Sequence, residues 1–339
     1  MNYFQKLVKN TPGNVFIIAE ACDNHMGSLD MAKYLARAAK LSGADAVKFQ
    51  HHLVDEEMIK NSVSSSNFSE PLYDFLKRNS LSLEDHIVLK KFCDDLDILY
   101  LCTPFSFQAA KEIHDLVPFF KIGSGEFQDF WFIDNLKLLN KPILFSCGMS
   151  TKDEILNWKL RYHDLDFALL NTLSEYPPVL QDMNISFIED LRLMFGPNVI
   201  IGHSDHTQTT WTSVLAVSKG AQIIEKHITL SHYIFGPDKD VSLDVNEFQL
   251  LVNEVKKVIL TLGNNKILNE NEKAIRNWAY RSVVYSKSLA SGHVITSEDI
   301  KTKRPGNGEI LSRDYESLIG KKLKMDVNFN CQVKKNDYE

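Results

Sequence analysis

The sequence predicts a (β/α)8 barrel followed by a small β-rich domain. Short apolar runs recur along residues 15–227, and helical segments separate them. The runs are apolar throughout, as expected for parallel strands that are buried on both faces. The eight runs are VFIIAEA (15–21), DAVKFQ (45–50), ILYLCTP (98–104), FFKIGSGE (119–126), PILFSCG (142–148), FALLNTLSEY (167–176), VIIGHSDH (199–206) and QIIEKH (222–227).

Helices are predicted in the intervals between these runs. Ser28 is a candidate N-cap for a helix that ends at Gly43, and Ser82 with Asp85 forms a candidate capping box for the helix over 82–96. Further helices are predicted over 106–116, 129–139, 151–161, 184–194, 208–219 and 245–262. The insert at 55–80 is longer than an ordinary strand–helix connection, so we expect it to act as a lid or to flank a neighbouring subunit.

The pattern changes after residue 263. Residues 264–281 are polar and read as a linker with a helical stretch, and residues 282–339 contain short β-like runs with little helix between them. The expected domains are therefore a barrel over 1–263, a linker over 264–281 and a β-rich domain over 282–339. So short a domain buries little apolar surface, and we expect it to dock on another surface.

Bulk composition narrows the function classes. The net charge of −6 over 339 residues argues against nucleic acid or an anionic membrane as the main partner, although a local cluster of lysines can still bind a small anion. The sequence shows neither a signal-peptide core nor an apolar run of membrane-spanning length, so we expect a cytoplasmic protein. The five cysteines lack a CxxC pair and read as reduced thiols; Cys22, Cys102 and Cys147 lie near strand ends, where packing is favoured over a nucleophilic role.

Two histidines end the seventh and eighth apolar runs. In a (β/α)8 barrel the active site lies at the carboxyl ends of the strands, and neighbouring strands are about 4.8 Å apart. His206 and His227 can therefore share one metal ion, for which Mn, Fe, Co or Zn is suitable. A pair of merely hydrogen-bonding histidines is the alternative.

Two lysines occupy strand ends inside apolar runs, where an unpaired ammonium group is costly. Lys48 and Lys121 predict an anionic ligand, either a phosphate or a carboxylate, with internal ion pairs to Glu20 or Glu126 as the alternative. Hydroxyl donors at the same level are Thr103, Ser124, Ser146 and Ser204.

Carboxylates complete the predicted site. Glu20, Glu126 and Asp238 are candidates for proton transfer or for binding hydroxyl groups, although Asp238 could simply cap a loop, and Gln50 and Tyr176 are weaker candidates. This set fits metal-assisted carbon–carbon bond formation between an anionic donor and a sugar. It fits equally a class I aldolase in which Lys121 forms a Schiff base, and a non-catalytic barrel with a carbohydrate- or ice-binding tail is a third interpretation.

Taken together, several motifs resemble the sialic acid synthase (nonulosonate synthase) family, which condenses phosphoenolpyruvate with an N-acylated hexosamine. They are FIIAEACDNHMGSLDMAK, GADAVKFQ, CTPF, FKIGSGE, SCGMST, SEYPP, IGHSDHT, IIEKHITL and GPDKDVSLD. The similarity continues through SLASGHVITSEDIKTKRPGNGEI and LIGKKL, which look like the antifreeze-like (SAF) domain of that family.

The resemblance implies a role for each matching residue. A divalent metal, typically Mn²⁺ with Mg²⁺ or Co²⁺ as alternatives, would bind His206 and His227. The catalytic group would comprise Glu20, Glu126, Asp238 and Lys121. Phosphoenolpyruvate would contact Lys48, Thr103, Lys121, Ser124, Ser146, Ser174 and Ser204, and the amino sugar would contact Glu20, Gln50, Glu126, Tyr176 and Asp238. Arg304 would reach the N-acyl group in the barrel of the partner subunit of a domain-swapped homodimer.

Three departures from the family pattern leave the acceptor sugar open. They are Cys22-Asp23 after the first strand, NTLSEYP in the sixth run and FGPD after the eighth. N-acetylmannosamine, which gives N-acetylneuraminate, is the first expectation. The rivals are 2,4-diacetamido-2,4,6-trideoxymannose, which gives legionaminate, and a 6-phosphorylated sugar.

Overall fold

The computed structural model describes residues 1–60, 70–263 and 265–339. The chain forms two compact units, Met1–Leu262 and Gly263–Glu339. No helix within these described ranges combines the length and the apolar character needed to cross a membrane.

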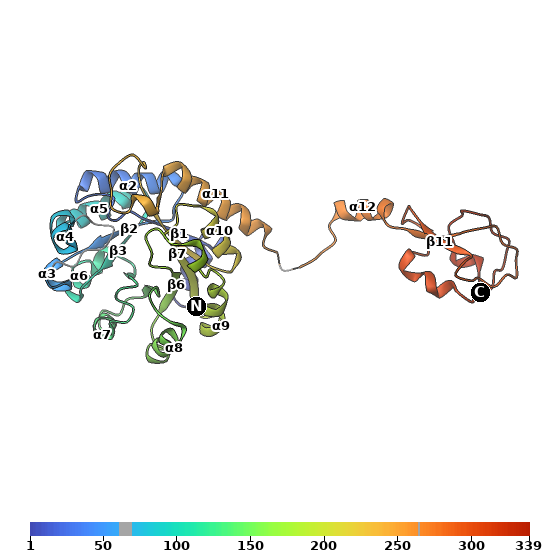
Figure 1. Cartoon of the computed structure of the whole chain (residues 1–339), viewed down its shortest axis with the longest axis horizontal. Coiled ribbons are helices and arrows are strands. Elements are labelled where there is room, and N and C mark those ends of the chain that lie inside the picture. Colours follow the sequence, from blue (N-terminus) through green and yellow to red (C-terminus); the bar gives the residue numbers. More distant parts are fainter. Residues whose placement is uncertain (61–69, 264) are drawn as a thin grey trace. The chain divides into compact units, whose positions relative to one another are not determined.

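The first unit is the predicted parallel barrel (Figure 1). β1 pairs in parallel with both β2 and β8, and the ladder runs in the order β3-β2-β1-β8-β7-β6-β5-β4, with β3 and β4 as neighbours at the seam. A short strand, β9 (Ser242–Leu243), adds to β8. The eight barrel strands are β1 (Phe16–Glu20), β2 (Ala46–His51), β3 (Leu99–Pro104), β4 (Phe120–Ile122), β5 (Ile143–Ser146), β6 (Phe167–Thr172), β7 (Ile200–Asp205) and β8 (Ile223–Ile228).

Helices surround the strands as predicted, and the sequence signals fix several of their ends. The Ser28 hydroxyl accepts from the Met31 N–H, Gly43 ends α2 with φ of +87°, and Ser82 and Asp85 form the expected capping box. The helix predicted over 106–116 is shorter, because α6 gives way to a 3-10 turn at His114–Leu116. The helices are α2 (Leu29–Ser42), α5 (Leu83–Asp95), α6 (Phe107–Glu112), α7 (Phe130–Lys137), α8 (Lys152–Arg161), α9 (Phe187–Phe195), α10 (Trp211–Ser218) and α11 (Val245–Thr261).

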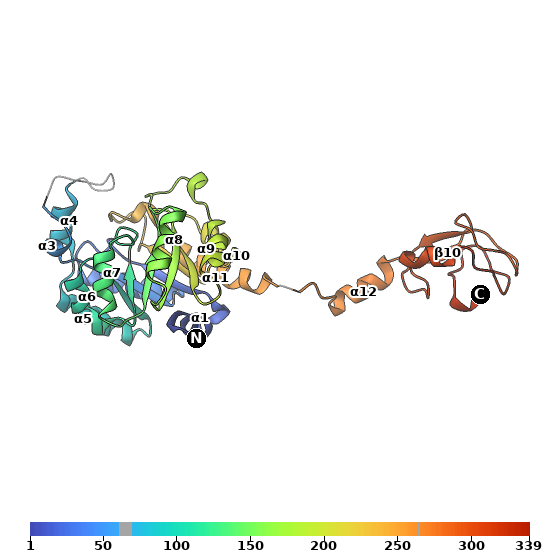
Figure 2. The ribbon, with the colours of Figure 1, turned by 90° about the horizontal axis from the view of Figure 1, so that it is seen from below.

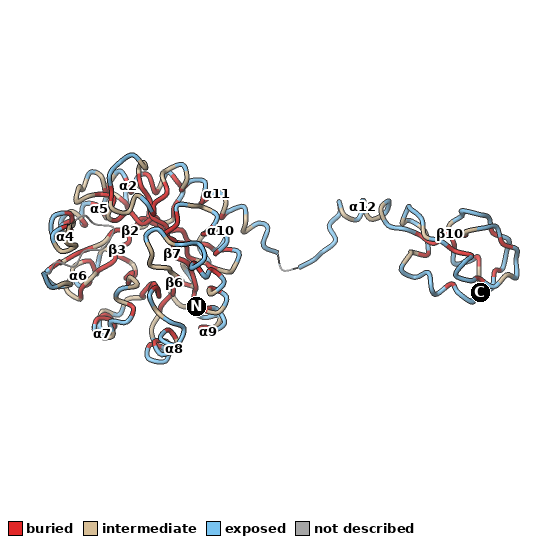
Figure 3. Tube along the Cα trace, viewed as in Figure 1, coloured by how far each residue is buried: buried red, intermediate tan, exposed pale blue. Residues whose placement is uncertain are grey.

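An amino-terminal helix, α1 (Tyr3–Asn10), closes one end of the barrel (Figure 2). Phe4 is fully buried among residues that begin the strands, including Phe16 and Ile223, and its ring lies 5.0 Å from that of Phe119. The sequence interpretation contained no helix here. This apolar cluster fills the amino ends of the strands, whereas the polar strand-end residues lie at the opposite end. Figure 3 shows the buried strands inside the ring of partly exposed helices.

The insert after β2 contains α3 (Val54–Glu57) and α4 (Leu72–Asn79), which contact each other. Phe75 and Leu76 are buried there with Val54. Residues 61–69 of the predicted insert lie outside the described residues, so the expectation that the insert acts as a lid or flanks a neighbouring subunit stays a prediction.

The second unit contains α12 (Glu270–Ala279) and a two-stranded antiparallel sheet of β10 (Ser282–Tyr285) and β11 (Ile300–Lys303). The helix-like SRDYESLIG stretch forms a 3-10 helix at Ser312–Leu318. Val283, Tyr285, Ile295 and other apolar side chains form a small core of its own. The second unit thus contains a small antiparallel sheet with a core of its own, as expected from the predicted fold class, and the unit also includes residues 264–281.

Candidate functional site

A cavity of about 530 Å³ opens at the carboxyl ends of the barrel strands. Its lining includes every site residue expected in the barrel, which brings side chains from all eight strands or the loops after them to one place. These residues are Glu20, Lys48, Gln50, Thr103, Lys121, Ser124, Glu126, Ser146, Ser174, Tyr176, Ser204, His206, His227 and Asp238.

Lys48 is the centre of a buried charge cluster. Its ammonium group pairs with Glu20, lies 3.7 Å from Glu225 and donates to the Thr103 hydroxyl at 3.2 Å. Burial disfavours the charged form, but the two carboxylates outweigh this effect and raise the pKa of Lys48. The internal ion pair with Glu20 considered from the sequence is thus present.

Lys121 has different surroundings. Its ammonium group donates to the Ser146 hydroxyl at 2.8 Å and to the Ile122 carbonyl at 2.9 Å, and it makes no ion pair with any described residue. Burial lowers the pKa of Lys121 to about 8. A buried ammonium group without a carboxylate partner is a suitable place for an anionic ligand, because the ligand would supply the missing counter-charge.

The two strand-end histidines face each other, with their ring centroids 5.4 Å apart. The Nδ1–H of His206 donates to the Leu173 carbonyl at 2.8 Å, and the Tyr176 hydroxyl donates to its Nε2 at 3.0 Å. Nδ1 of His227 is buried without a hydrogen-bond partner, 3.9 Å from Asp238 Oδ2. Burial lowers the pKa of both rings, that of His206 to about 4, so both offer neutral imidazole lone pairs and fit a divalent metal ion.

Two acidic residues of the cavity have raised pKa values. Burial, followed by repulsion from Asp23, raises the pKa of Asp238 to about 8, and an Asp238 oxygen accepts from the Asp23 N–H at 2.8 Å. Burial also raises the pKa of Glu126, and its Oε2 has no hydrogen-bond partner among the described residues. Asp238 can therefore exchange protons near neutral pH, and both side chains can transfer a proton or bind a hydroxyl group.

The sequence interpretation missed Glu225, which lies in the cavity and accepts from the Ser204 hydroxyl at 3.1 Å. The signal was available in the run QIIEKH. Alternate residues of a strand share a face, so a His227 that points inward requires Glu225 to point inward and Lys226 outward. Other unpredicted lining residues are Asp23, His52, Glu57 and Phe105.

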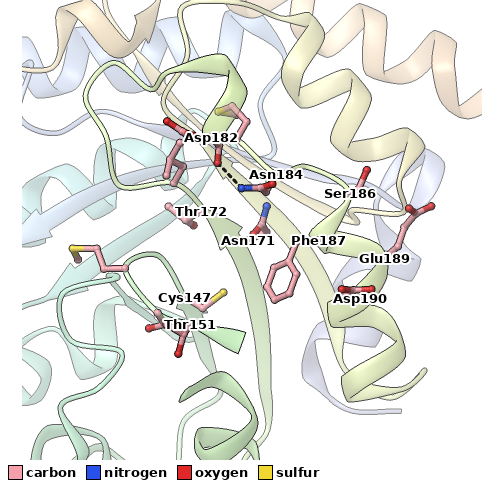
Figure 4. Close-up of a pocket in the computed structure, with 14 residues that line it drawn as sticks. Cys147, Thr151, Asn171, Thr172, Asp182, Asn184, Ser186, Phe187, Glu189 and Asp190 are labelled. Atoms are coloured by element: carbon pink, nitrogen blue, oxygen red, sulfur yellow. Dashed lines mark hydrogen bonds between the residues drawn. The ribbon is translucent and has the colours of Figure 1, made fainter. Parts of the chain in front are cut away.

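Burial raises the pKa of the Cys102 and Cys147 thiols to about 12, and that of Cys22 well above its ordinary value. A thiolate is thus disfavoured at each of them, which agrees with packing rather than nucleophilic roles. Cys147 also lines a second cavity of about 690 Å³ between the loops after β5 and β6 (Figure 4). Asp182, Phe187 and Asp190 line it with Asn171, but none of the site residues expected from the sequence does.

Arg304 belongs to the second unit and does not line the central cavity. Its Nε–H donates to the Ala279 carbonyl at 3.0 Å, and its guanidinium group lies 5.7 Å from the centre of the Trp278 ring. The side chain is exposed. Its expected contact with a sugar in a partner barrel stays a prediction.

The family models and the similar proteins of known sequence point to the same family. The NeuB family matches residues 35–267, and the SAF domain matches residues 280–339. The pseudaminic acid synthase of Campylobacter jejuni (strain 81-176) is 33% identical, covering 97% of this chain and 98% of the relative. The N,N'-diacetyllegionaminic acid synthase of Legionella pneumophila is also 33% identical, with 92% and 91% covered.

A solved structure, the N-acetylneuraminic acid (sialic acid) synthetase of Leptospira borgpetersenii in complex with citrate, superposes with a TM-score of 0.70 at 28% identity. The match covers 79% of this chain and 92% of that one. The two synthases cover 97% and 92% of this chain, so the sequence similarity extends over most of both units. The chain belongs to the NeuB family of nonulosonic acid synthases, with a carboxyl-terminal SAF domain.

Proposed function

We propose that the chain condenses phosphoenolpyruvate with an N-acylated mannosamine-type sugar, such as N-acetylmannosamine, and releases phosphate. The observation that carries this proposal is the placement of Lys48 and Lys121, both buried, in one cavity with two neutral imidazoles. The two lysines fit a donor that carries both a phosphate and a carboxylate. The imidazoles of His206 and His227 fit a divalent metal ion, with Mn²⁺ as our first choice.

The donor would bind across the two lysines. Lys121 lacks a counter-charge and would pair with one anionic group, while Lys48 would contact the other without leaving Glu20. Hydroxyl groups at the same level can donate to the remaining oxygens; they are those of Thr103, Ser124, Ser146, Ser174 and Ser204. Glu225 lies close enough to Lys48 to limit the excess positive charge before the donor arrives.

The reaction joins C3 of phosphoenolpyruvate to the aldehyde carbon of the open-chain sugar. A divalent cation held by His206 and His227 would polarise that aldehyde oxygen. Water then adds to C2, and the bond between C2 and the phosphate oxygen breaks. Glu126 and Asp238, whose pKa values are raised, are the side chains that can transfer the protons at the aldehyde oxygen and at the attacking water.

We further propose a homodimer in which Arg304 of one subunit contacts the N-acyl group bound in the other. Arg304 is exposed, and among the described residues only its Nε–H is found to donate, to the Ala279 carbonyl, so the rest of its guanidinium group is accessible for such a contact. The relatives' activities support the chemistry but belong to those proteins. A cytoplasmic location is the corresponding expectation, because phosphoenolpyruvate is a metabolite of that compartment.

Phosphate release tests this function directly. Purified protein with Mn²⁺, phosphoenolpyruvate and an N-acylated mannosamine-type sugar should release phosphate, and a chelator should stop the release. In ¹⁸O-labelled water the label should appear in the keto-acid product and not in the phosphate. Label in the phosphate would contradict cleavage at C2, whereas activity that survives the chelator, together with borohydride trapping of pyruvate on Lys121, would point to the Schiff-base aldolase.

A further inference from the structure

The loop after β5 passes close to two hydroxyl groups that line the central cavity. Gly148 lies in this loop, two residues after Ser146, which ends β5, and it is buried. A Cβ atom added to Gly148 would lie 2.4 Å from Ser174 Oγ and 2.7 Å from Ser124 Oγ. Both distances are shorter than van der Waals contact, so the two hydroxyl groups already occupy the space that a side chain at position 148 would need.

The backbone conformation of Gly148 does not itself require glycine. Gly27 and Gly43 have φ angles of +73° and +87°, whereas the φ of Gly148 is not positive. Alanine at position 148 would therefore meet no left-handed backbone strain. The close approach of the two serine side chains is the feature that requires a residue without a Cβ atom.

The Gly148 backbone also orients one of the two hydroxyl groups. Its N–H donates to Ser124 Oγ at 3.1 Å, so this oxygen acts as an acceptor toward the loop and its O–H is left to act as a donor. Neither Ser124 nor Ser174 donates its hydroxyl hydrogen to another residue in the described part of the chain, and both line the cavity. Because both oxygens lie within 2.7 Å of one point, the two hydroxyl groups can donate to a single anionic group.

The three loops involved follow neighbouring strands. Ser124, Gly148 and Ser174 come after β4, β5 and β6, which are adjacent in the barrel. On the same strands, Lys121 of β4 donates to the Ser146 hydroxyl of β5 at 2.8 Å. The two hydroxyl groups beside Gly148 therefore lie on the Lys121 side of the cavity, where the anionic donor would bind.

From this arrangement we infer that Gly148 is a positioning residue for phosphoenolpyruvate: the lack of a side chain at this residue lets the Ser124 and Ser174 hydroxyl groups converge on one anionic group of the donor. The inference rests on the proposed function and adds a residue that acts through the two serines. A methyl group at position 148 would turn both hydroxyl groups away. Serine side chains rotate between staggered conformations, so the fold should survive while donor binding weakens.

The first arm of the test is the Gly148→Ala variant. It should raise KM for phosphoenolpyruvate about 10- to 100-fold, the effect expected when hydrogen bonds to a charged group are lost. KM for the N-acylated sugar should change less than about threefold, because sites without shared contacts respond independently. Calorimetric titration of the protein with phosphoenolpyruvate, in the presence of Mn²⁺ and without the sugar, should show the same loss of affinity.

Ser150→Ala is the matched control for a change in the same loop. Ser150 lies two residues beyond Gly148 and does not line the central cavity, and its hydroxyl contacts the Gly148 carbonyl only at 3.5 Å. This substitution places no atom between the two serines. Affinity for phosphoenolpyruvate should therefore stay within about threefold of that of the parent protein.

The second arm repeats Gly148→Ala in a protein that already carries Ser124→Ala and Ser174→Ala. The hydroxyl groups that the added methyl group displaces are then absent, so a further loss of affinity should be less than about twofold. The Ser124 Cβ would lie 3.1 Å from the new Cβ, a contact that a shift of a few tenths of an ångström relieves. A purely structural role for Gly148 would instead cost the same affinity in both backgrounds.

The possible results distinguish failure of the proposed function from failure of the role of Gly148. If the parent protein neither binds phosphoenolpyruvate nor releases phosphate from it, the proposed function fails. If the parent binds phosphoenolpyruvate and Gly148→Ala binds it equally well, or loses affinity equally in both backgrounds, the inference is overturned. Thermal unfolding of Gly148→Ala well below that of the parent protein would also overturn it, since the hydroxyl groups and not the backbone are expected to yield.

Discussion

Replacing Lys226 by methionine is expected to lower the free energy of unfolding by about 3–5 kcal/mol, the range found when one partner of a buried ion pair is removed. Lys226 and Asp205 are both fully buried, with the Lys226 Nζ 3.1 Å from Asp205 Oδ2. Burial disfavours the Asp205 carboxylate, but Lys226 outweighs this effect and lowers its pKa. In the Lys226→Met variant that carboxylate would keep its hydroxyl donors and lose its counter-charge.

Neighbouring hydroxyl groups form hydrogen bonds with both members of the buried ion pair. Thr212 and Ser213 each donate to Asp205 at 2.6 Å, and the Thr207 hydroxyl accepts from Lys226 at 3.0 Å. Asp205 and Lys226 are opposite each other in the β7–β8 ladder, one residue before His206 and His227. The network therefore fixes the two strand ends that carry the histidines.

Urea unfolding of three variants measures this effect. Lys219→Met is the control, because Lys219 forms a partly exposed ion pair with Glu189 at 2.9 Å. This substitution should lower the free energy of unfolding by less than about 1 kcal/mol. Adding Asp205→Asn to Lys226→Met should recover part of the lost free energy of unfolding, since the unpaired charge of the Asp205 carboxylate is removed. A Lys226→Met variant as stable as Lys219→Met would show that the ion pair contributes no net stability.

Replacing Lys121 by methionine is expected to lower kcat/KM for phosphoenolpyruvate by about 30- to 4000-fold, which corresponds to the 2–5 kcal/mol lost when one partner of a buried charge pair is truncated. Folding should survive, because Lys121 makes no ion pair with a described residue and its ammonium group is already disfavoured by burial. Steady-state kinetics combined with thermal unfolding separates these two effects. A kcat/KM that stays within threefold of the parent value would contradict a role for Lys121 in donor binding.

The pH dependence adds an independent check on Lys121. Donor binding needs the ammonium form, and the pKa of Lys121 in the free protein is about 8. The kcat/KM for phosphoenolpyruvate should therefore decline as the pH rises through about 8. A Lys121→Arg variant should show a shallower decline, because guanidinium stays charged and only the titration of Asp238, whose pKa is also about 8, is left. In a Schiff-base mechanism the neutral amine is the nucleophile, so the same rise in pH would favour the reaction and arginine would abolish it.

Strand positions were predictable because strands buried on both faces leave continuous apolar runs, and each predicted run contains its observed strand to within a residue. Helix ends marked by Ser28, Gly43 and Ser82 were predictable from capping chemistry. The polar helix α1 was not, because only Phe4 and Val8 are buried and their partners lie far along the chain. Tertiary packing stabilises this helix, and no local signal reports it.

The cavity could be predicted for residues that end strands, because parallel strands bring their carboxyl ends together. His52 and Glu57 escaped notice since they come from the insert after β2, whose position depends on packing between α3 and α4. Arg304 is a third case: it is exposed in the second unit, and its observed hydrogen bond to Ala279 gives no test of the predicted contact with a partner barrel. Function carried by connections is thus harder to read from sequence than function carried by strand ends.

The closure of β1 on β8 has a consequence for how the protein is made. Phe16 pairs with Ile223, so the first strand to leave the ribosome waits for the last barrel strand before both of its edges are satisfied. During synthesis, the growing sheet exposes unpaired backbone groups at an edge that can join with other nascent chains. Any fragment that stops before β8 should retain this open edge and aggregate, whereas the second unit has a core of its own and does not depend on that edge.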